Sequence, residues 1–413
     1  MSVNGVWSGL VGQQRAVGTL RRAVEAAKKS RPGASSGGAG ATANMGAATP
    51  PDMAAMTHAW LLTGPPGSGR SVAARAFAAA LECPDGGCGV CNTCRTALSG
   101  AHPDVTLCRT EQLSIGVDEV RELVVKAMLT PIAGPWQVIV IEDADRLTDR
   151  AADALLKSLE EPPPRTVWVL CAPSADDLIV TIRSRTREVR LVTPPDADVV
   201  RLLAAEGVAA GPALAAARAS QGHIGRARAL ATDATAMQAR AAIVDLPSQW
   251  TSISQCLVSA ADVVGRAQAE ATATTSELDA KERAELDLAL GFGTSGTRSG
   301  TRVRPRSAAT AVAQLEDQQK ARAKRLQRDA LDTVLIELTT WYRDVLAAQV
   351  GAPEAEFINV AAQARTNLVA ESTTPARTAA CLDAILAARR AIDGNVPPLL
   401  AMEALFVTLG GFS

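Results

Sequence analysis

The sequence contains few aromatic residues and no excess of charge of either sign. Its 413 residues include only 6 Trp, 1 Tyr and 5 Phe, and 42 Lys and Arg nearly balance 43 Asp and Glu. A protein that neutralises DNA phosphates by itself needs clustered basic residues in excess, and a platform that stacks nucleic-acid bases needs more aromatic side chains. The composition therefore argues against a protein whose own surface carries most of a DNA-binding load.

The sequence also lacks an N-terminal signal pattern and a long hydrophobic run. The first residues show no basic segment followed by an apolar one, and no stretch of eighteen or more residues is both apolar and uncharged. We therefore expect a cytoplasmic protein with no membrane partner. The chain length predicts two or three domains. A hydrophobic content of 47%, with 80 Ala, favours packed and mainly helical domains.

Short apolar runs that alternate with helical patterns predict an α/β domain in the N-terminal part. Residues 59–63, 136–141, 166–170 and 188–192 are expected to form buried strands with helices between them. Strands buried on both faces are typical of a parallel sheet that helices cover on each side.

The same patterns divide the chain into three regions. We expect an α/β domain over 1–192, a small helical domain over 193–238 and an all-α domain over 239–413. Two stretches rich in small and polar residues, 31–56 and 270–309, are expected to be flexible insertions.

The clearest local motif is the glycine-rich loop Gly64-Pro-Pro-Gly-Ser-Gly-Arg-Ser71 between an expected strand and an expected helix. Gly64, Gly67 and Gly69 would let backbone N–H groups turn toward a phosphate, and Ser71 would offer a hydroxyl to Mg²⁺. However, Arg70 stands where the motif needs Lys, and the two side chains are not interchangeable. Binding of ATP or ADP, and a loop kept only for its tight turn, both stay open.

An acidic pair, Glu142 and Asp143, follows the second expected strand. ATP hydrolysis uses one carboxylate that holds Mg²⁺ and a group that orients the attacking water. Here the order is Glu and then Asp, so the carboxylate of Asp143 falls about one methylene short of the place where a water-orienting Glu belongs. Since such displacements can lower a rate by orders of magnitude, we expect that the chain alone does not hydrolyse ATP.

Four of the eight cysteines fall in one short module, Cys83-x4-Cys88-x2-Cys91-x2-Cys94. Four thiolates at this spacing suit a closed, tetrahedral structural Zn²⁺ site. Disulfides are the alternative, but they are rare in a reducing compartment. The sequence therefore predicts a zinc module over 83–94. The scattered cysteines are expected to be small buried hydrophobic residues: Cys108, Cys171, Cys256 and Cys381.

A further motif, Ser184-Arg185-Thr186, lies just before the last expected strand. Arg185 suits either of two roles. It would serve as a structural ion-pair partner, or as an arginine finger that reaches the γ-phosphate on a neighbouring subunit.

Together these motifs resemble the delta-prime subunits of bacterial DNA polymerase III clamp loaders, which are AAA+ proteins. The resemblance covers roughly residues 8–230. It depends on the order of seven segments: residues 9–14 (Gly-Leu-Val-Gly-Gln-Gln), the phosphate loop 64–71, the Cys module 83–94, residues 101–104 (Ala-His-Pro-Asp), 141–145 (Ile-Glu-Asp-Ala-Asp), 154–162 (Ala-Leu-Leu-Lys-Ser-Leu-Glu-Glu-Pro) and 184–186 (Ser-Arg-Thr).

The resemblance implies a RecA-like AAA+ domain with an inserted zinc module, a small helical lid, and a C-terminal helical collar through which subunits assemble. It implies a stator subunit that does not hydrolyse ATP and that lends Arg185 to an adjacent motor subunit. The implied partners are the gamma/tau and delta subunits, the sliding clamp and primer–template DNA. Any DNA polymerase activity would belong to the holoenzyme rather than to this chain.

The alternative within the same assembly is an ATP-hydrolysing motor subunit. Three positions separate the two hypotheses: Arg70, Asp143 and Gly225. ATP-active relatives carry a γ-phosphate-sensing Arg where the resemblance aligns Gly225. The family usually has Cys where this chain has Thr186, a difference that leaves the preceding Arg unaffected.

Overall fold

The computed structural model describes residues 5–29, 55–110, 114–290, 306–352 and 357–412. The chain divides into two compact units, one formed by residues 1–110 and 114–232 and the other by 111–113 and 233–413. Most of the expected insertion 31–56 lies outside the described residues, as does the 291–305 part of the second insertion.

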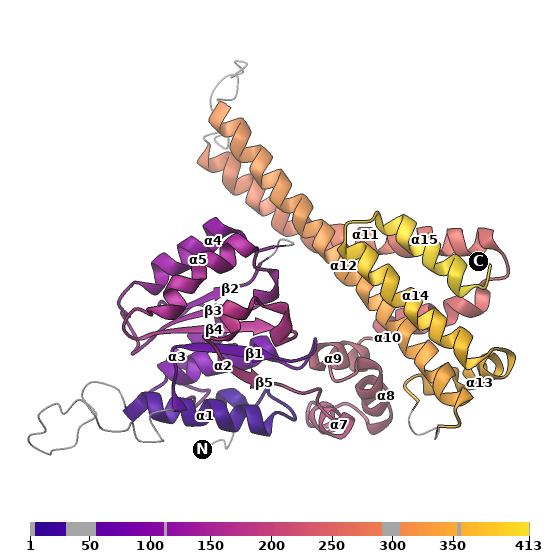
Figure 1. The fold of residues 1–413 in the computed structure, drawn as a ribbon, viewed down its shortest axis with the longest axis horizontal. Coiled ribbons are helices and arrows are strands. Elements are labelled where there is room, and N and C mark those ends of the chain that lie inside the picture. Colours follow the sequence, from indigo (N-terminus) through magenta and orange to yellow (C-terminus); the bar gives the residue numbers. More distant parts are fainter. Residues whose placement is uncertain (1–4, 30–54, 111–113, 291–305, 353–356, 413) are drawn as a thin grey trace, which may run out of the picture. The chain divides into compact units, whose positions relative to one another are not determined.

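A five-stranded parallel sheet forms the centre of the first unit (Figure 1). Its strands pair in the order β2-β3-β4-β1-β5. Every residue of β1, β3 and β4 is buried, as parallel strands between two helical layers should be. The strands are β1 (Ala59–Thr63), β2 (Val105–Cys108), β3 (Gln137–Ile141), β4 (Thr166–Ala172) and β5 (Arg187–Arg190).

Helices cover both faces of this sheet, so that alternate strand residues enter two different cores. Trp60 and Leu62 pack with α1, α2 and α3, whereas Leu61 packs with α4 and α5. Figure 1 shows these two layers above and below the strands. The helices are α1 (Gln14–Lys29), α2 (Arg70–Glu82), α3 (Asn92–Ser99), α4 (Val117–Ala127), α5 (Asp149–Glu160) and α6 (Val180–Arg183), with 3-10 turns η1 (Gly5–Trp7), η3 (Ala144–Arg146) and η4 (Ala175–Asp177).

Three short helices complete the first unit: α7 (Asp196–Ala205), α8 (Ala210–Ser220) and α9 (Ile224–Thr232). We call them the lid. The next helix, α10 (Ala234–Asp245), belongs to the second unit, so the division falls about six residues before the expected boundary at 238. A buried ion pair, Arg240 Nε to Glu337 Oε2 at 2.9 Å, joins α10 to α12.

The second unit is helical throughout the residues that the structure describes. Its core gathers large side chains such as Trp341, Leu338, Met402 and Phe406. The elements after α10 are η5 (Leu246–Gln249), α11 (Ile253–Ala289), α12 (Arg306–Gln349), η7 (Val360–Ala362), α13 (Gln363–Ser372), α14 (Pro375–Asp393) and α15 (Pro398–Leu409). None of the described helices is both long enough and apolar enough to cross a bilayer.

The expected loose stretch 270–309 is corrected where the structure describes it. Residues 270–289 are the second half of α11, and α12 already begins at Arg306. Small or polar residues such as Ala271 and Thr275 are buried on this part of α11. Ion pairs join the two helices, among them Arg283 Nη2 to Glu316 Oε1 at 2.7 Å. Because small and charged residues make these contacts, no apolar period marks the helix in the sequence.

Candidate nucleotide and metal sites

Helix α2 connects the two candidate sites of the first unit. The phosphate loop leads from β1 into its N-terminus, and Cys83 caps its C-terminus. Its 13 residues span about 20 Å. The helix is fixed beneath the sheet by an unbroken run of buried residues from Ala76 to Glu82. The two ends of one rigid element therefore present two different kinds of chemistry.

The backbone of the phosphate loop takes the turns that the motif predicts. Gly67 and Gly69 have φ angles of 81° and 91°, in the left-handed region where glycine is favoured. The loop is held from outside by Gln13, which is 3% exposed. Its Nε2 donates to Ser68 O at 3.2 Å and to Val192 O at 2.6 Å, and its Oε1 accepts from the N–H of Val192 at 3.1 Å. One buried amide therefore ties the loop to the segment that follows β5.

Arg70 folds back onto the loop that carries it. Its Nη1 donates to the carbonyl oxygen of Gly64 at 2.5 Å. The phosphate-loop Lys that this residue replaces would instead extend toward the β- and γ-phosphates. The guanidinium of Arg70 thus stabilises the loop itself. Ser71, the expected Mg²⁺-facing residue, is half-buried in the first turn of α2.

The acidic pair lies at the carboxyl end of β3, and α2 reaches it through a residue that sequence analysis did not select. Arg75 Nε lies 2.6 Å from Glu142 Oε1, and the Glu142 side chain is 5% exposed. Glu142 is therefore already paired with an internal cation. Asp143 follows it at the start of η3 and is half-buried. An arginine within an otherwise alanine-rich, buried helix was the signal in the sequence for Arg75.

The lid touches the phosphate loop through His223, at the N-terminal end of α9. A Cβ atom built at Gly67 would lie only 2.5 Å from the Cα of His223, so the two backbones are in direct contact. Gly225 lies on the first turn of α9 and offers no side chain to sense a phosphate. Further along α9, Arg228 pairs with Glu206 through Nη2 at 2.5 Å.

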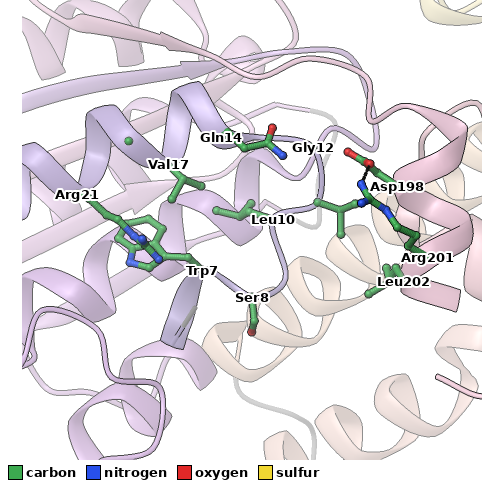
Figure 2. A pocket seen from close by; sticks show the side chains of 12 residues that line it. Trp7, Ser8, Leu10, Gly12, Gln14, Val17, Arg21, Asp198, Arg201 and Leu202 are labelled. Atoms are coloured by element: carbon green, nitrogen blue, oxygen red, sulfur yellow. Dashed lines mark hydrogen bonds and ion pairs between the residues drawn. The ribbon is translucent and has the colours of Figure 1, made fainter. Parts of the chain in front are cut away.

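A cavity of about 490 Å³ lies beside this region, between the N-terminal segment and α7 (Figure 2). Figure 2 shows Trp7, Leu10 and Val17 on one side and the Asp198–Arg201 ion pair on the other. Two segments almost 180 residues apart form its walls, which is why no local sequence motif indicated it. Its lining is mixed, with apolar side chains from the N-terminal segment and an ion pair from α7.

The four cysteines of the module converge at the other end of α2. The Sγ atom of Cys83 lies 3.8 Å from those of Cys88 and Cys91, and the Sγ atoms of Cys88 and Cys94 are 4.0 Å apart. Four thiolates at about 2.3 Å from a tetrahedral Zn²⁺ would be about 3.8 Å from one another. None of these cysteines forms a disulfide. Their spacing therefore fits a metal ion rather than a pair of disulfides.

Backbone N–H groups favour the thiolate at part of this cluster. Burial raises the pKa of Cys83, but hydrogen bonds from the backbone of Cys88, Gly87 and Asp85 outweigh it and lower that pKa to about 6. Backbone hydrogen bonds also lower the pKa of Cys88, whereas burial raises the pKa of Cys94. Burial raises the pKa of the Cys108 thiol to about 12, helped by nearby Glu119, so this thiol stays neutral.

The structure places Arg185 away from the phosphate loop, on the turn that follows α6. Its Nη2 lies 2.5 Å from Glu160 Oε1 at the end of α5. Its Nη1 donates to Thr181 O at 2.8 Å and to Ser184 Oγ at 3.1 Å. The side chain is 35% exposed. Both roles considered for Arg185 thus have a basis, because it has an ion-pair partner and remains accessible.

Comparison with known proteins shows what parts of this chain are similar to. The family model described as "DNA polymerase III, delta subunit" matches residues 51–195. The delta-prime subunit of DNA polymerase III from Escherichia coli is 39% identical over 180 residues, which cover 42% of this chain and 54% of that subunit. The delta-prime subunit from Pseudomonas aeruginosa is 40% identical over 134 residues, covering 31% and 41%.

A gamma/tau subunit of DNA polymerase III, from Mycobacterium tuberculosis, is also similar. It is 32% identical over 166 residues, which cover 38% of this chain and 29% of that subunit. The chain spans about half the length of the first of these relatives and less of the others. The crystal structure of a gamma-subunit-related protein from Thermotoga maritima aligns with 68% of this chain and 93% of its own, at 17% identity and a TM-score of 0.32.

Proposed function

We propose that this chain is the stator of a sliding-clamp loader, because residues 51–195 match the family model described as "DNA polymerase III, delta subunit" and two delta-prime subunits are 39% and 40% identical to parts of the chain. In this role it assembles with gamma/tau and delta subunits and helps to load the clamp on primer–template DNA. It does not hydrolyse ATP. It lends Arg185 to the nucleotide site of a neighbouring motor subunit, within a AAA+ assembly whose collar is the helical second unit.

The position of Arg185 is the observation that carries the proposal. The guanidinium contacts Glu160 and Thr181 O, and the side chain is 35% exposed. Among the described residues, it makes no hydrogen bond or ion pair with the phosphate loop of its own unit. An arginine used in its own nucleotide site would have to face that loop. An accessible arginine on an anchored turn is instead suited to a phosphate that arrives on another subunit.

Three features of the chain's own phosphate site support the absence of turnover. Arg70 bonds back to Gly64 O, Glu142 is paired with Arg75, and His223 packs on Gly67. A phosphate and its Mg²⁺ would compete with each of these contacts. Binding of ATP or ADP is compatible with the retained glycines, whereas the contacts of Arg70, Glu142 and His223 disfavour hydrolysis.

Zn²⁺ is the proposed structural cofactor, held by Cys83, Cys88, Cys91 and Cys94. When bound, the ion would fix the loop between α2 and α3. Its four ligands leave no open coordination position, so we assign it no part in a reaction.

The experiment that tests the proposal measures ATP turnover by a reconstituted loader that contains the Arg185→Ala chain. We expect the site beside this subunit to lose about 10³-fold in rate, so that turnover of the whole loader falls to that of its remaining sites or below. Arg183→Ala is the matched control, because Arg183 is the last residue of α6, two residues before Arg185, and pairs with Asp176 instead. Unchanged turnover with Arg185→Ala would overturn the finger role.

The alternative function is that of an ATP-hydrolysing motor subunit of the same loader. The gamma/tau relative and the retained loop glycines favour it. The two functions differ in what the purified chain does alone. ATP hydrolysis by the isolated chain that is lost in Ser71→Ala would support the motor, and its absence would support the stator.

A further inference from the structure

The contacts of Arg185 leave one part of its guanidinium available. The group has five N–H donors in a fixed plane. Nη1 donates to Thr181 O and to Ser184 Oγ, and Nη2 makes an ion-pair contact with Glu160 Oε1. Among the described residues, Nε–H therefore has no hydrogen-bond acceptor, and Nη2 has only its ion-pair contact with Glu160. Two N–H groups on adjacent nitrogens form the fork that binds two oxygens of a phosphate.

The helices that carry Glu160 and precede Arg185 pack into the same core, while the Glu160 side chain itself is 48% exposed. Glu160 is the last residue of α5, whose Leu155 and Leu159 are buried in the core on that face of the sheet. Ile182 of α6, three residues before Arg185, is fully buried in the same core. The two elements that carry the ion pair are thus packed into one rigid layer, and the Arg185 side chain bridges them.

The chemistry of the three contacts separates their roles. Thr181 O and Ser184 Oγ belong to the same turn as Arg185, so they move with it. Glu160 alone is charged, and it alone comes from a different element. Without Glu160 the long arginine side chain would keep local contacts but would lose the one that fixes its direction relative to the sheet.

We propose that Glu160 is a positioning residue for Arg185. Through its carboxylate it holds Nη2 so that the remaining N–H groups of the guanidinium face a phosphate on the neighbouring subunit. The inference depends on the proposed function, because it needs Arg185 to act in trans. It assigns a second residue to that function, one that touches neither nucleotide nor Mg²⁺.

The test uses the reconstituted loader and compares five variants of this chain. The contribution of the neighbouring site is the turnover of the wild-type loader minus that of the Arg185→Ala loader. We expect Glu160→Ala to lower this contribution about tenfold at saturating ATP, with the KM for ATP unchanged, because a misdirected group affects the rate more than binding. Glu160→Gln keeps an acceptor of the same length and should retain most of the rate.

The matched control is Glu161→Ala. This variant removes the same negative charge from the neighbouring residue, whose side chain makes no hydrogen bond or ion pair with Arg185. It should leave the rate unchanged. In the double variant Glu160→Ala with Arg185→Ala, the loss should equal that of Arg185→Ala alone, since Glu160 acts only through Arg185. The melting temperature and the loader assembly of each variant show whether a loss of ATP turnover comes from misfolding. If Glu160→Ala misfolds, the isosteric Glu160→Gln and the double variant decide whether Glu160 positions Arg185.

Each outcome bears on one of the two proposals. Full activity of Glu160→Ala beside a defective Arg185→Ala overturns the role of Glu160 and leaves the finger in place. A raised rate, equal losses in Glu160→Ala and Glu161→Ala, or losses that add in the double variant also overturn it. No defect in Arg185→Ala overturns the proposed function itself.

Discussion

The two ends of α2 differ in how their sites are built. At the N-terminal end, the chain's own groups occupy the phosphate loop region: Arg70 bonds to Gly64 O, and the lid residue His223 lies against Gly67. At the C-terminal end, four sulfur atoms are spaced as ligands of one tetrahedral ion would be. The phosphate loop at one end is contacted by side chains of the chain itself. The cysteine module at the other end has the geometry of a metal site.

The difference shows how a motif relates to a site. The cysteine module has all of its ligands within twelve consecutive residues, so local folding brings them together. The phosphate loop depends on residues from distant segments, such as Gln13, Glu142 and His223. Its glycines can persist for the backbone turn alone, while the groups around them decide whether a phosphate can enter.

The largest expected effect comes from breaking the metal end. Cys94→Ser removes a buried ligand, and we expect the purified protein to lose its zinc and to melt about 10 °C lower, since a loss of about 3 kcal/mol shifts the melting temperature of a unit of this size by roughly that amount. Metal content by mass analysis and thermal unfolding measure both.

Cys256→Ala is the control for this variant, because Cys256 is buried in the second unit. It should keep one zinc per chain. Equal zinc content in the Cys94→Ser protein would exclude the four-cysteine site.

The next effect concerns the contact between the lid and the phosphate loop. Gly67→Ala forces a side chain into the left-handed region and against His223, and we expect it to destabilise the first unit by about 3 kcal/mol. Gly207→Ala is the matched variant: Gly207 has a φ of 91° but nothing within 4 Å of its Cβ position, so only about 1 kcal/mol should be lost.

Chemical denaturation of the two glycine variants measures this difference. If Gly67→Ala cost no more than Gly207→Ala, the lid would not rest on the loop in solution.

A smaller effect is expected at the acidic pair. Arg75→Ala leaves the buried Glu142 carboxylate without its cation, whereas Glu142→Gln removes the charge that needs one. Because Arg75 is partly exposed, we expect a loss of about 2 kcal/mol for Arg75→Ala and less than about 1 kcal/mol for Glu142→Gln. Denaturant unfolding of both variants tests the asymmetry. Equal losses would mean that the pair does not neutralise a buried charge.

The smallest effect should follow from restoring the motif residue. Arg70→Lys frees Gly64 O and supplies the usual phosphate-loop cation. Since the contacts of Glu142 and Gly67 remain, we expect less than about a tenfold gain in ATP affinity, measured by calorimetry with the isolated chain, and no hydrolysis. Measurable turnover by this single variant would show that Arg70 alone had silenced the site.

Sequence reasoning found those features whose residues lie close together in the chain. The apolar runs at β1, β3 and β4 were recognised because every residue in them is buried. Strand β2 was missed, since it has four residues and only two of them are buried. The second half of α11 was missed because it packs through small side chains and ion pairs.

In the candidate sites, the cysteine cluster could be predicted from spacing alone. Arg75, His223 and Glu160 could not, because each makes its contact with a residue many positions away in the sequence. The hydrogen bond from Arg70 to Gly64 O could not be predicted either. The phosphate-loop motif identifies the replacement of Lys by Arg but not the direction of the guanidinium.

The cysteine loop also holds the start of the described chain. The N–H of Val6 donates to Gly87 O at 3.0 Å, and a side chain at Gly5 would overlap that same oxygen. Residues 5–7 therefore pack against the cysteine loop, whose conformation a bound metal ion would stabilise. A protease should cut this N-terminal turn slowly while the ion is bound and quickly after chelation, so that cleavage at the first described residues becomes a reporter of metal occupancy.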